Sequence, residues 1–212
     1  MSDKFNKIYD QSINNPEKFW GDASEDIFWF KKPTKILNKS NPPFYKWYED
    51  GVTNTCYNAL DIHIDQGNGK RIALIYDSPI TGNKSKLTYE ELKSKVAKFA
   101  GALRSQGVKK GDRIIIYMPM IPEAVIAMLA CARIGAIHSV VFGGFASNEL
   151  ASRIDDSKAK ILVTASCGFE PGRTVEYKPL VDEAIKQANH KIDKMILFQR
   201  SGHEVKLNAA SE

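Results

Sequence analysis

The sequence predicts an α/β domain with a mainly parallel sheet flanked by helices, preceded by an extension of short helices and irregular, aromatic-rich chain. Three observations predict it. From residue 71 onward, short apolar runs alternate with segments of helical spacing. The apolar runs are continuous, which is typical of parallel strands covered on both faces. The 212 residues are 43% hydrophobic and 26% charged, which suffices for one large core and argues against disorder.

The extension begins with two expected helices. Apolar residues recur at helical spacing from Phe5 to Ile13, and Pro16 can begin a second short helix. From 28 to 57, aromatic residues are mixed with prolines without a sustained period, so we expect an irregular segment packed on the surface of a domain. Helical spacing resumes at 56–64.

The domain is expected to alternate strands and helices in a regular order. Apolar runs predict strands at residues 71–76, 113–118, 138–142, 160–164 and 194–198. Helical spacing predicts helices at residues 88–103, 121–134, 147–156 and 179–189. Thr88 and Glu91 form a capping box at the first helix start, and Gly107 and Gly135 are typical helix-ending residues.

Charge and apolar content exclude several classes of protein. Thirty Lys and Arg face 25 Asp and Glu, and the two signs are interleaved, so the net +5 predicts no nucleic-acid-binding arm. The longest apolar run, 124–132, is shorter than the about 20 residues of a membrane-spanning helix. Residues 1–11 lack an apolar signal core and an Arg-rich transit composition. We therefore expect a cytoplasmic protein, with the mitochondrial matrix as the alternative.

Neither cysteines nor histidines suggest a metal site. The three cysteines are far apart and form no Cys-x-x-Cys pair, and the histidines have no ligand at metal-binding spacing. Free thiols in a reducing compartment and no resident metal are expected.

Two glycine-containing segments are candidate phosphate sites. Residues 78–85 lack the Walker A pattern, which favours a solvated loop. Gly143 and Gly144 follow a predicted strand without G-x-G-x-x-G spacing. Ligands bind beyond the carboxyl ends of strands in open α/β sheets, but paired glycines there are also ordinary turn residues.

Two arginines follow predicted strands at positions from which a phosphate could be reached. Arg153 lies on the helix after the paired glycines, and Arg173 ends the segment 168–173, which we expect to be a loop that glycine and proline restrict. A guanidinium binds phosphate through two parallel hydrogen bonds. Each arginine could equally form a surface ion pair, so the residues alone reach only an α/β domain that could bind a phosphorylated small molecule.

Several strings are more specific than these patterns. NTCYNALD at 54–61, YMPM at 117–120, ACARIGA at 130–136 and SVVFGGF at 139–145 resemble the amino-terminal region of AMP-forming short-chain acyl-CoA synthetases. The resemblance to these acetyl-CoA and propionyl-CoA synthetases, members of the adenylate-forming superfamily, runs from about residue 9 to about residue 199. It is strongest for the propionyl type.

The resemblance implies a two-step ligase reaction. A carboxylate attacks the α-phosphate of ATP to give an acyl-adenylate and pyrophosphate, and the CoA thiol then displaces AMP. It implies an extension at 1–66 and the start of an AMP-binding domain at 67–212, hence an incomplete amino-terminal domain. The family's phosphate loop, T-S-G-[ST]-T-G-x-P-K, and its catalytic lysine are not in these residues. We therefore expect CoA as the relevant ligand, ATP and Mg²⁺ only in a complete synthetase, and no activity from this chain alone.

The resemblance also implies a CoA site. The family loop that matches Glu170 to Arg173 usually reads R-x-G-R, and its arginines hold the 3′-phosphate of CoA; Glu170 replaces the first arginine here, as in propionyl-type members. The strand-ending Phe-Gly-Gly turn resembles the wall past which the pantetheine arm runs. The implied CoA contacts are Phe142, Gly143, Gly144, Arg153, Glu170, Pro171, Gly172 and Arg173, with no catalytic residue.

Two other interpretations remain. The chain could be a non-catalytic short isoform or fragment that associates with itself or with a full-length synthetase through an unfinished sheet edge. It could also be an unrelated flavodoxin-like binding domain, which the aromatic segment at 28–57 disfavours. The sequence does not distinguish acetate from propionate.

Overall fold

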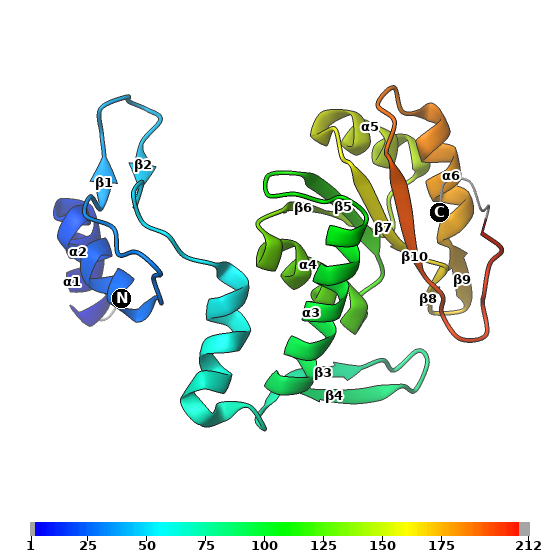
Figure 1. The fold of residues 1–212 in the computed structure, drawn as a ribbon, viewed down its shortest axis with the longest axis horizontal. Helices are drawn as coiled ribbons and strands as arrows, with labels where there is room; N and C mark the ends of the chain where they lie inside the picture. The colour runs from blue at the N-terminus through cyan, green and yellow to red at the C-terminus, as the bar shows by residue number, and fades with distance from the viewer. Residues whose placement is uncertain (1–2, 208–212) are drawn as a thin grey trace. The chain divides into compact units, whose positions relative to one another are not determined.

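The protein is described by a computed structural model that covers residues 3–207. Its contacts divide the chain into two compact units, residues 1–58 and residues 59–212. Figure 1 shows the elements of each unit by label and colour.

The first unit contains the two predicted helices, α1 (Asp3–Asn14) and α2 (Pro16–Ala23), and both predictions are confirmed. A short 3₁₀ turn, η1 (Ser24–Asp26), follows α2. The segment after it is mostly irregular, as expected, with one antiparallel pair of two-residue strands, β1 (Leu37–Asn38) and β2 (Lys46–Trp47). Aromatic rings hold it together, because the rings of Trp20 and Trp47 lie 6.2 Å apart and those of Phe28 and Tyr57 lie 4.6 Å apart.

Helical turns predicted after residue 56 are present and include two π-helical segments, η2 (Tyr57–Asp61) and η3 (Ile64–Asn68). In the second unit Asp61 is buried and accepts ion pairs from Lys93 at 3.0 Å and from Arg133 at 2.5 Å. Burial opposes ionisation of this carboxyl, but the two basic partners lower its pKa overall. The pairs fasten this turn to the helices that carry Lys93 and Arg133.

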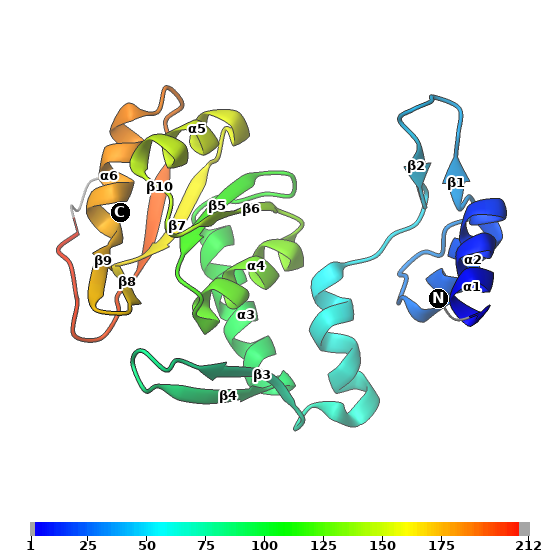
Figure 2. The ribbon, with the colours of Figure 1, turned by 180° about the vertical axis from the view of Figure 1, so that it is seen from behind.

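The second unit is built on a four-stranded parallel sheet. Its order is β10 (Lys194–Phe198), β7 (Ile161–Ala165), β5 (Arg113–Met118), β6 (Ile137–Phe142). Four helices cover it: α3 (Tyr89–Ser105), α4 (Pro122–Ile134), α5 (Ser147–Ser157) and α6 (Tyr177–Gln187). Figures 1 and 2 show the α3–α4 pair and the α5–α6 pair on opposite faces. The expected α/β class is confirmed.

The centre of the sheet is buried on both faces, as its continuous apolar runs predict. Ile115 and Tyr117 pack into the core with residues of α5 and α6. Ile114 and Ile116, which point to the other face because side chains alternate along a strand, are fully buried too. The capping box is also confirmed: the Thr88 hydroxyl accepts a hydrogen bond from the Glu91 amide, and the Glu91 carboxylate accepts one from the Thr88 amide.

The expectation of burial on both faces is wrong for β6. This strand is at the edge of the described sheet, and Ile137, Val140 and Phe142 are exposed. An apolar run sets which residues favour burial, but the strand's place in the sheet decides whether anything covers them.

Residues 71–76 are strand, but not a buried strand of the main sheet. β3 (Ile72–Asp77) pairs antiparallel with β4 (Lys84–Thr88) in a separate hairpin, and its Ile72 and Ile75 are exposed. The sequence KSKLT of β4 has a single apolar side chain before its cap residue, so its pattern does not indicate a strand.

The segment 168–173 was expected as a loop and is instead part of a second hairpin. β8 (Cys167–Glu170) and β9 (Arg173–Glu176) pair antiparallel across the turn Pro171–Gly172, where Gly172 has φ 74°. A left-handed φ favours glycine because it has no Cβ. Glycine and proline therefore mark a tight turn rather than a longer loop.

Candidate functional site

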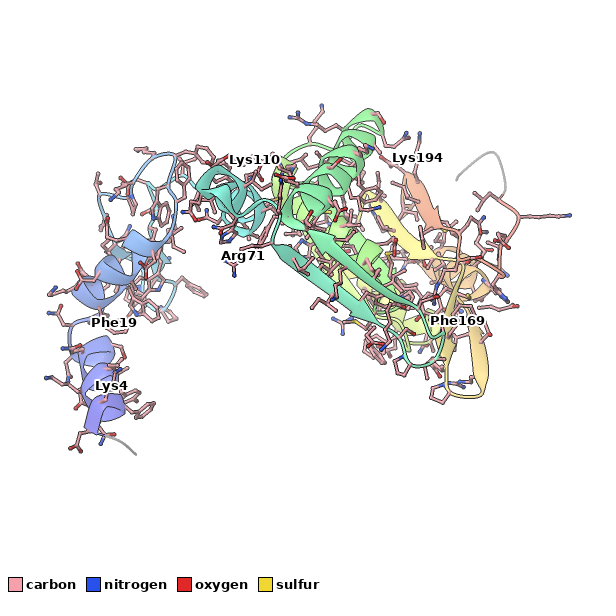
Figure 3. All side chains as sticks on the ribbon, turned by 90° about the horizontal axis from the view of Figure 1, so that it is seen from below. Lys4, Phe19, Arg71, Lys110, Phe169 and Lys194 are labelled. Carbon is pink, nitrogen blue, oxygen red and sulfur yellow. The ribbon has the colours of Figure 1, made fainter. Side chains whose placement is uncertain are left out.

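A cavity of about 530 Å³ opens at the carboxyl ends of the parallel strands. Met118 at the end of β5, Phe142 at the end of β6 and Arg200 after β10 all line it. Phe169 of the β8–β9 hairpin closes one side. In Figure 3, Phe169 lies at the lower side of this unit. Lys110, which precedes β5, and Lys194, which begins β10, lie at its upper side. This is the edge of the sheet where open α/β folds bind ligands.

The turn after β6 forms one wall of the cavity. A Cβ on Gly143 would lie 2.2 Å from the Tyr177 hydroxyl and 3.2 Å from the Met118 carbonyl, so only glycine fits without displacement. The atoms nearest to a Cβ on Gly144 belong to the ring of Phe142, a residue that is 71% exposed. The wall is therefore bare backbone beside an exposed aromatic ring, and a thin ligand can approach it closely.

Tyr177 supports this wall from behind. Its side chain is buried and its ring lies 5.0 Å from that of Tyr117, whose hydroxyl donates a 2.7 Å hydrogen bond to the Phe145 carbonyl. Burial, with a smaller effect of Tyr117, raises the pKa of Tyr177 to about 12. Tyr177 is thus a neutral packing group at physiological pH.

The β8–β9 hairpin forms the rim. Glu170 lines the cavity, and its carboxylate accepts a hydrogen bond from Arg173 Nε at 2.7 Å and forms an ion pair with Arg173 Nη2 at 2.6 Å. The Arg173 side chain is 71% exposed and is not among the residues that line the cavity. The ion pair spans the Pro171–Gly172 turn, so the two opposite charges largely neutralise each other there.

The structure brings together part of the set expected from the sequence. Phe142, Gly143, Gly144 and Glu170 line the cavity. Pro171, Gly172 and Arg173 continue the same hairpin at its rim, whereas Arg153 is exposed on α5 and does not line the cavity.

Arg200 is a lining residue that the sequence analysis missed. Its guanidinium lies 4.4 Å from the ring centroid of Phe169, and its amide donates a 2.9 Å hydrogen bond to the Ser166 hydroxyl. It comes two residues after the predicted strand 194–198, at the same edge of the sheet as the paired glycines. That position was the signal available in the sequence.

Within residues 3–207, no group of three or more His, Cys, Asp or Glu side chains is placed to hold a metal ion. The same residues contain no helix both long and apolar enough to cross a membrane. The three cysteines are free and buried, and burial raises the pKa of Cys131 to about 12.

Both parts of the chain match known protein families. Residues 5–59 match the family model described as acetyl-coenzyme A synthetase N-terminus, and residues 63–212 match the one described as AMP-binding enzyme. A Homo sapiens protein, acyl-CoA synthetase short-chain family member 3, mitochondrial, is 55% identical over 193 residues, which are 91% of this chain and 28% of that protein. An acetyl-coenzyme A synthetase of Streptomyces coelicolor is 47% identical over 199 residues, 94% of this chain and 30% of the relative.

The fold has a solved counterpart. Acetoacetyl-CoA synthetase from Streptomyces lividans superposes with a TM-score of 0.82 at 25% identity, covering 92% of this chain and 30% of that one. The chain thus spans less than a third of the length of these relatives and matches their amino-terminal part. Because the AMP-binding model covers more than half of its residues, the chain belongs to the AMP-binding enzyme family, and the relatives that it resembles are named as short-chain acyl-CoA and acetyl-CoA synthetases.

Proposed function

We propose that the cavity at the carboxyl ends of β5 and β6 binds the CoA substrate of a short-chain acyl-CoA synthetase. The observation that carries the proposal is the Gly143–Gly144 wall, which presents backbone to a cavity lined mainly by apolar and aromatic side chains together with Asp77, Glu170 and Arg200. A pantetheine arm is thin and carries amide groups, so it suits a wall without side chains. The names of the relatives support CoA chemistry.

Each residue of the expected set has a part in this proposal. The ring of Phe142 and the two glycines guide the arm along the wall, and the Glu170–Arg173 pair orders the rim. Pro171 and Gly172 hold the hairpin turn that brings this pair together. Arg153 lies outside the cavity and acts only through its charge.

We also propose that the complete synthetase, of which this chain matches a part, catalyses acyl-CoA formation. Propionate or acetate, ATP and CoA would give acyl-CoA, AMP and pyrophosphate. Among residues 3–207, no group of three or more His, Cys, Asp or Glu side chains is placed to hold a metal ion, and ATP and Mg²⁺ belong in this proposal to the complete synthetase. What this chain contributes in the proposal is CoA binding and part of the main sheet.

A leucine scan of two glycines tests CoA binding. Gly144→Leu places a side chain at the cavity wall and is expected to weaken CoA binding at least about tenfold in calorimetric titration of the 212-residue chain. Gly101→Leu is the matched control, because Gly101 is exposed on α3 with open space for a Cβ. Equal CoA affinity in the two variants would contradict the proposal.

Adenylation is tested separately. With acetate or propionate, ATP and Mg²⁺, the 212 residues alone are expected to release no pyrophosphate, since the family's phosphate loop is not among them. Release that persists after rigorous purification, and that tracks the protein through the final column, would contradict this expectation.

The compartment is proposed as the cytoplasm, with the mitochondrial matrix as the alternative suggested by the name of the human relative. Fractionation of cells against a matrix marker distinguishes them, and co-purification with that marker would favour the alternative.

A further inference from the structure

Three charged residues line the cavity, and two of them are neutralised by a partner. Asp77 is paired with Lys84 at 2.8 Å, and Glu170 is paired with Arg173 at 2.6 Å. The third is Arg200, and among residues 3–207 no carboxylate lies within ion-pair distance of its guanidinium. The uncompensated charge of the cavity is therefore positive and is located at Arg200.

The guanidinium of Arg200 is also held in place before any ligand arrives. It stacks over Phe169 at 4.4 Å, and Nη1 donates a long 3.4 Å hydrogen bond to the Cys167 carbonyl. The main chain is fixed as well, because the Arg200 amide donates to the Ser166 hydroxyl at 2.9 Å. An arginine has five N–H donors, so this arrangement leaves several of them for an anion.

Arg173 is placed less favourably for the same task. Two of its nitrogens, Nε and Nη2, already lie on the Glu170 carboxylate, and its side chain projects into solvent beside the rim. A phosphate approaching Arg173 would also meet the negative charge of Glu170. Because the Arg173 side chain is exposed, water further weakens its electrostatic attraction for a phosphate.

We propose that Arg200, and not Arg173, is the principal phosphate-binding residue of this cavity. The inference rests on the proposed function and deepens it, since the phosphate belongs to CoA. A planar guanidinium stacked on an aromatic ring can direct two parallel N–H donors at two phosphate oxygens. Phe169 serves as the platform that sets their direction.

Calorimetric titration of the 212-residue chain with three ligands tests this assignment. CoA carries a 3′-phosphate and a diphosphate, dephospho-CoA keeps only the diphosphate, and pantetheine has neither. Arg200→Gln is expected to weaken CoA binding roughly ten- to a hundredfold while leaving pantetheine binding unchanged. Arg173→Gln is expected to weaken CoA binding less than about threefold.

The dephospho-CoA arm identifies which phosphate Arg200 holds. A loss with Arg200→Gln for CoA alone assigns the 3′-phosphate, and a loss for both nucleotides assigns the diphosphate. Arg104→Gln is the matched control: Arg104 lies in the last turn of α3, before the amino end of β5, away from the cavity. It should leave all three affinities unchanged.

Two further variants separate binding from folding. Arg200→Lys keeps the charge without the planar fork and is expected to restore only part of the CoA affinity. Phe169→Leu keeps Arg200 without its platform and is expected to weaken CoA binding several-fold with no effect on pantetheine. If Arg200→Gln does not unfold cooperatively, and so is not properly folded, these two variants provide the test in its place.

The failures are distinguishable. If Arg173→Gln loses the CoA affinity and Arg200→Gln keeps it, the assignment of Arg200 is overturned while CoA binding by the cavity stands. If the parent chain binds pantetheine as tightly as CoA, the assignment of Arg200 fails while binding of the pantetheine arm by the cavity stands. If the parent chain does not bind CoA at all, the proposed function fails together with the assignment.

Discussion

Two turns border the same cavity, and they are fixed by different forces. The turn after β6 is held by steric contact, because Gly143 packs against the Tyr177 hydroxyl and the Met118 carbonyl. The turn between β8 and β9 projects into solvent and is held by the left-handed Gly172 and the Glu170–Arg173 pair. A side chain at Gly143 should therefore act mainly on folding, whereas changes in the second turn should act mainly on ligand affinity.

The largest expected effect is on the wall. Gly143→Ala places a Cβ against a buried tyrosine and should lower the free energy of unfolding by about 1–3 kcal/mol. Gly144→Ala should change it by less than about 0.5 kcal/mol, since the exposed Phe142 ring can move away. Urea unfolding measures both.

A second substitution sharpens this result. Combining Gly143→Ala with Tyr177→Phe should restore part of the lost stability, because the nearest clashing atom is the tyrosine hydroxyl. Equal stability of the Gly143→Ala and Gly144→Ala variants would show that close packing does not fix this turn.

The next effect concerns alkaline pH. The pKa of Tyr177 is raised to about 12, above its value of about 10 in unfolded chains, so its neutral form is favoured by folding. This stabilisation is present below pH 10 and is lost as pH rises from about 10 to 12, by at most about 2–3 kcal/mol. Tyr177→Phe should flatten the decline in that range, as measured by urea unfolding at successive pH values. An unchanged slope would argue against a buried neutral phenol.

A smaller effect is expected at the rim. Glu170→Gln removes a negative charge from the cavity and releases Arg173, so CoA should bind roughly two- to fivefold more tightly. The free energy of unfolding should change by less than about 0.5 kcal/mol, because the pair is exposed. Titration calorimetry with CoA measures the gain. Weaker binding would mean that Glu170 contacts the ligand favourably.

The smallest effect is on association between copies. We expect the chain to self-associate through the open edge of β6, where Ile137, Val140 and Phe142 are exposed. Val140→Lys should shift the sedimentation profile toward monomer at micromolar concentration. A parent chain that already sediments as a stable monomer would refute this expectation.

The sequence predicted what depends on local pattern. The capping box at Thr88, the buried β5 and the helix-ending Gly135 are each specified by residues close together in the chain. The glycine wall was found in the same way, as a turn directly after a strand.

What the sequence did not predict depends on neighbours distant in the chain. The exposure of β6 follows from its place at the sheet edge, which no run of residues encodes. Arg200 was missed because the fold brings it onto Phe169, 31 positions earlier. The hairpin at Pro171 was missed because its strands are short and half-exposed.

Hydrogen–deuterium exchange with and without CoA tests the central claim that the cavity at the carboxyl ends of the strands binds CoA. Saturating CoA is expected to slow exchange in peptides that cover residues 142–145 and 167–170, because the ligand covers both sides of the cavity. Peptides that cover residues 104–110, near the amino end of β5, should exchange as before. Unchanged exchange in the first two segments, or protection found only in 104–110, would contradict the claim.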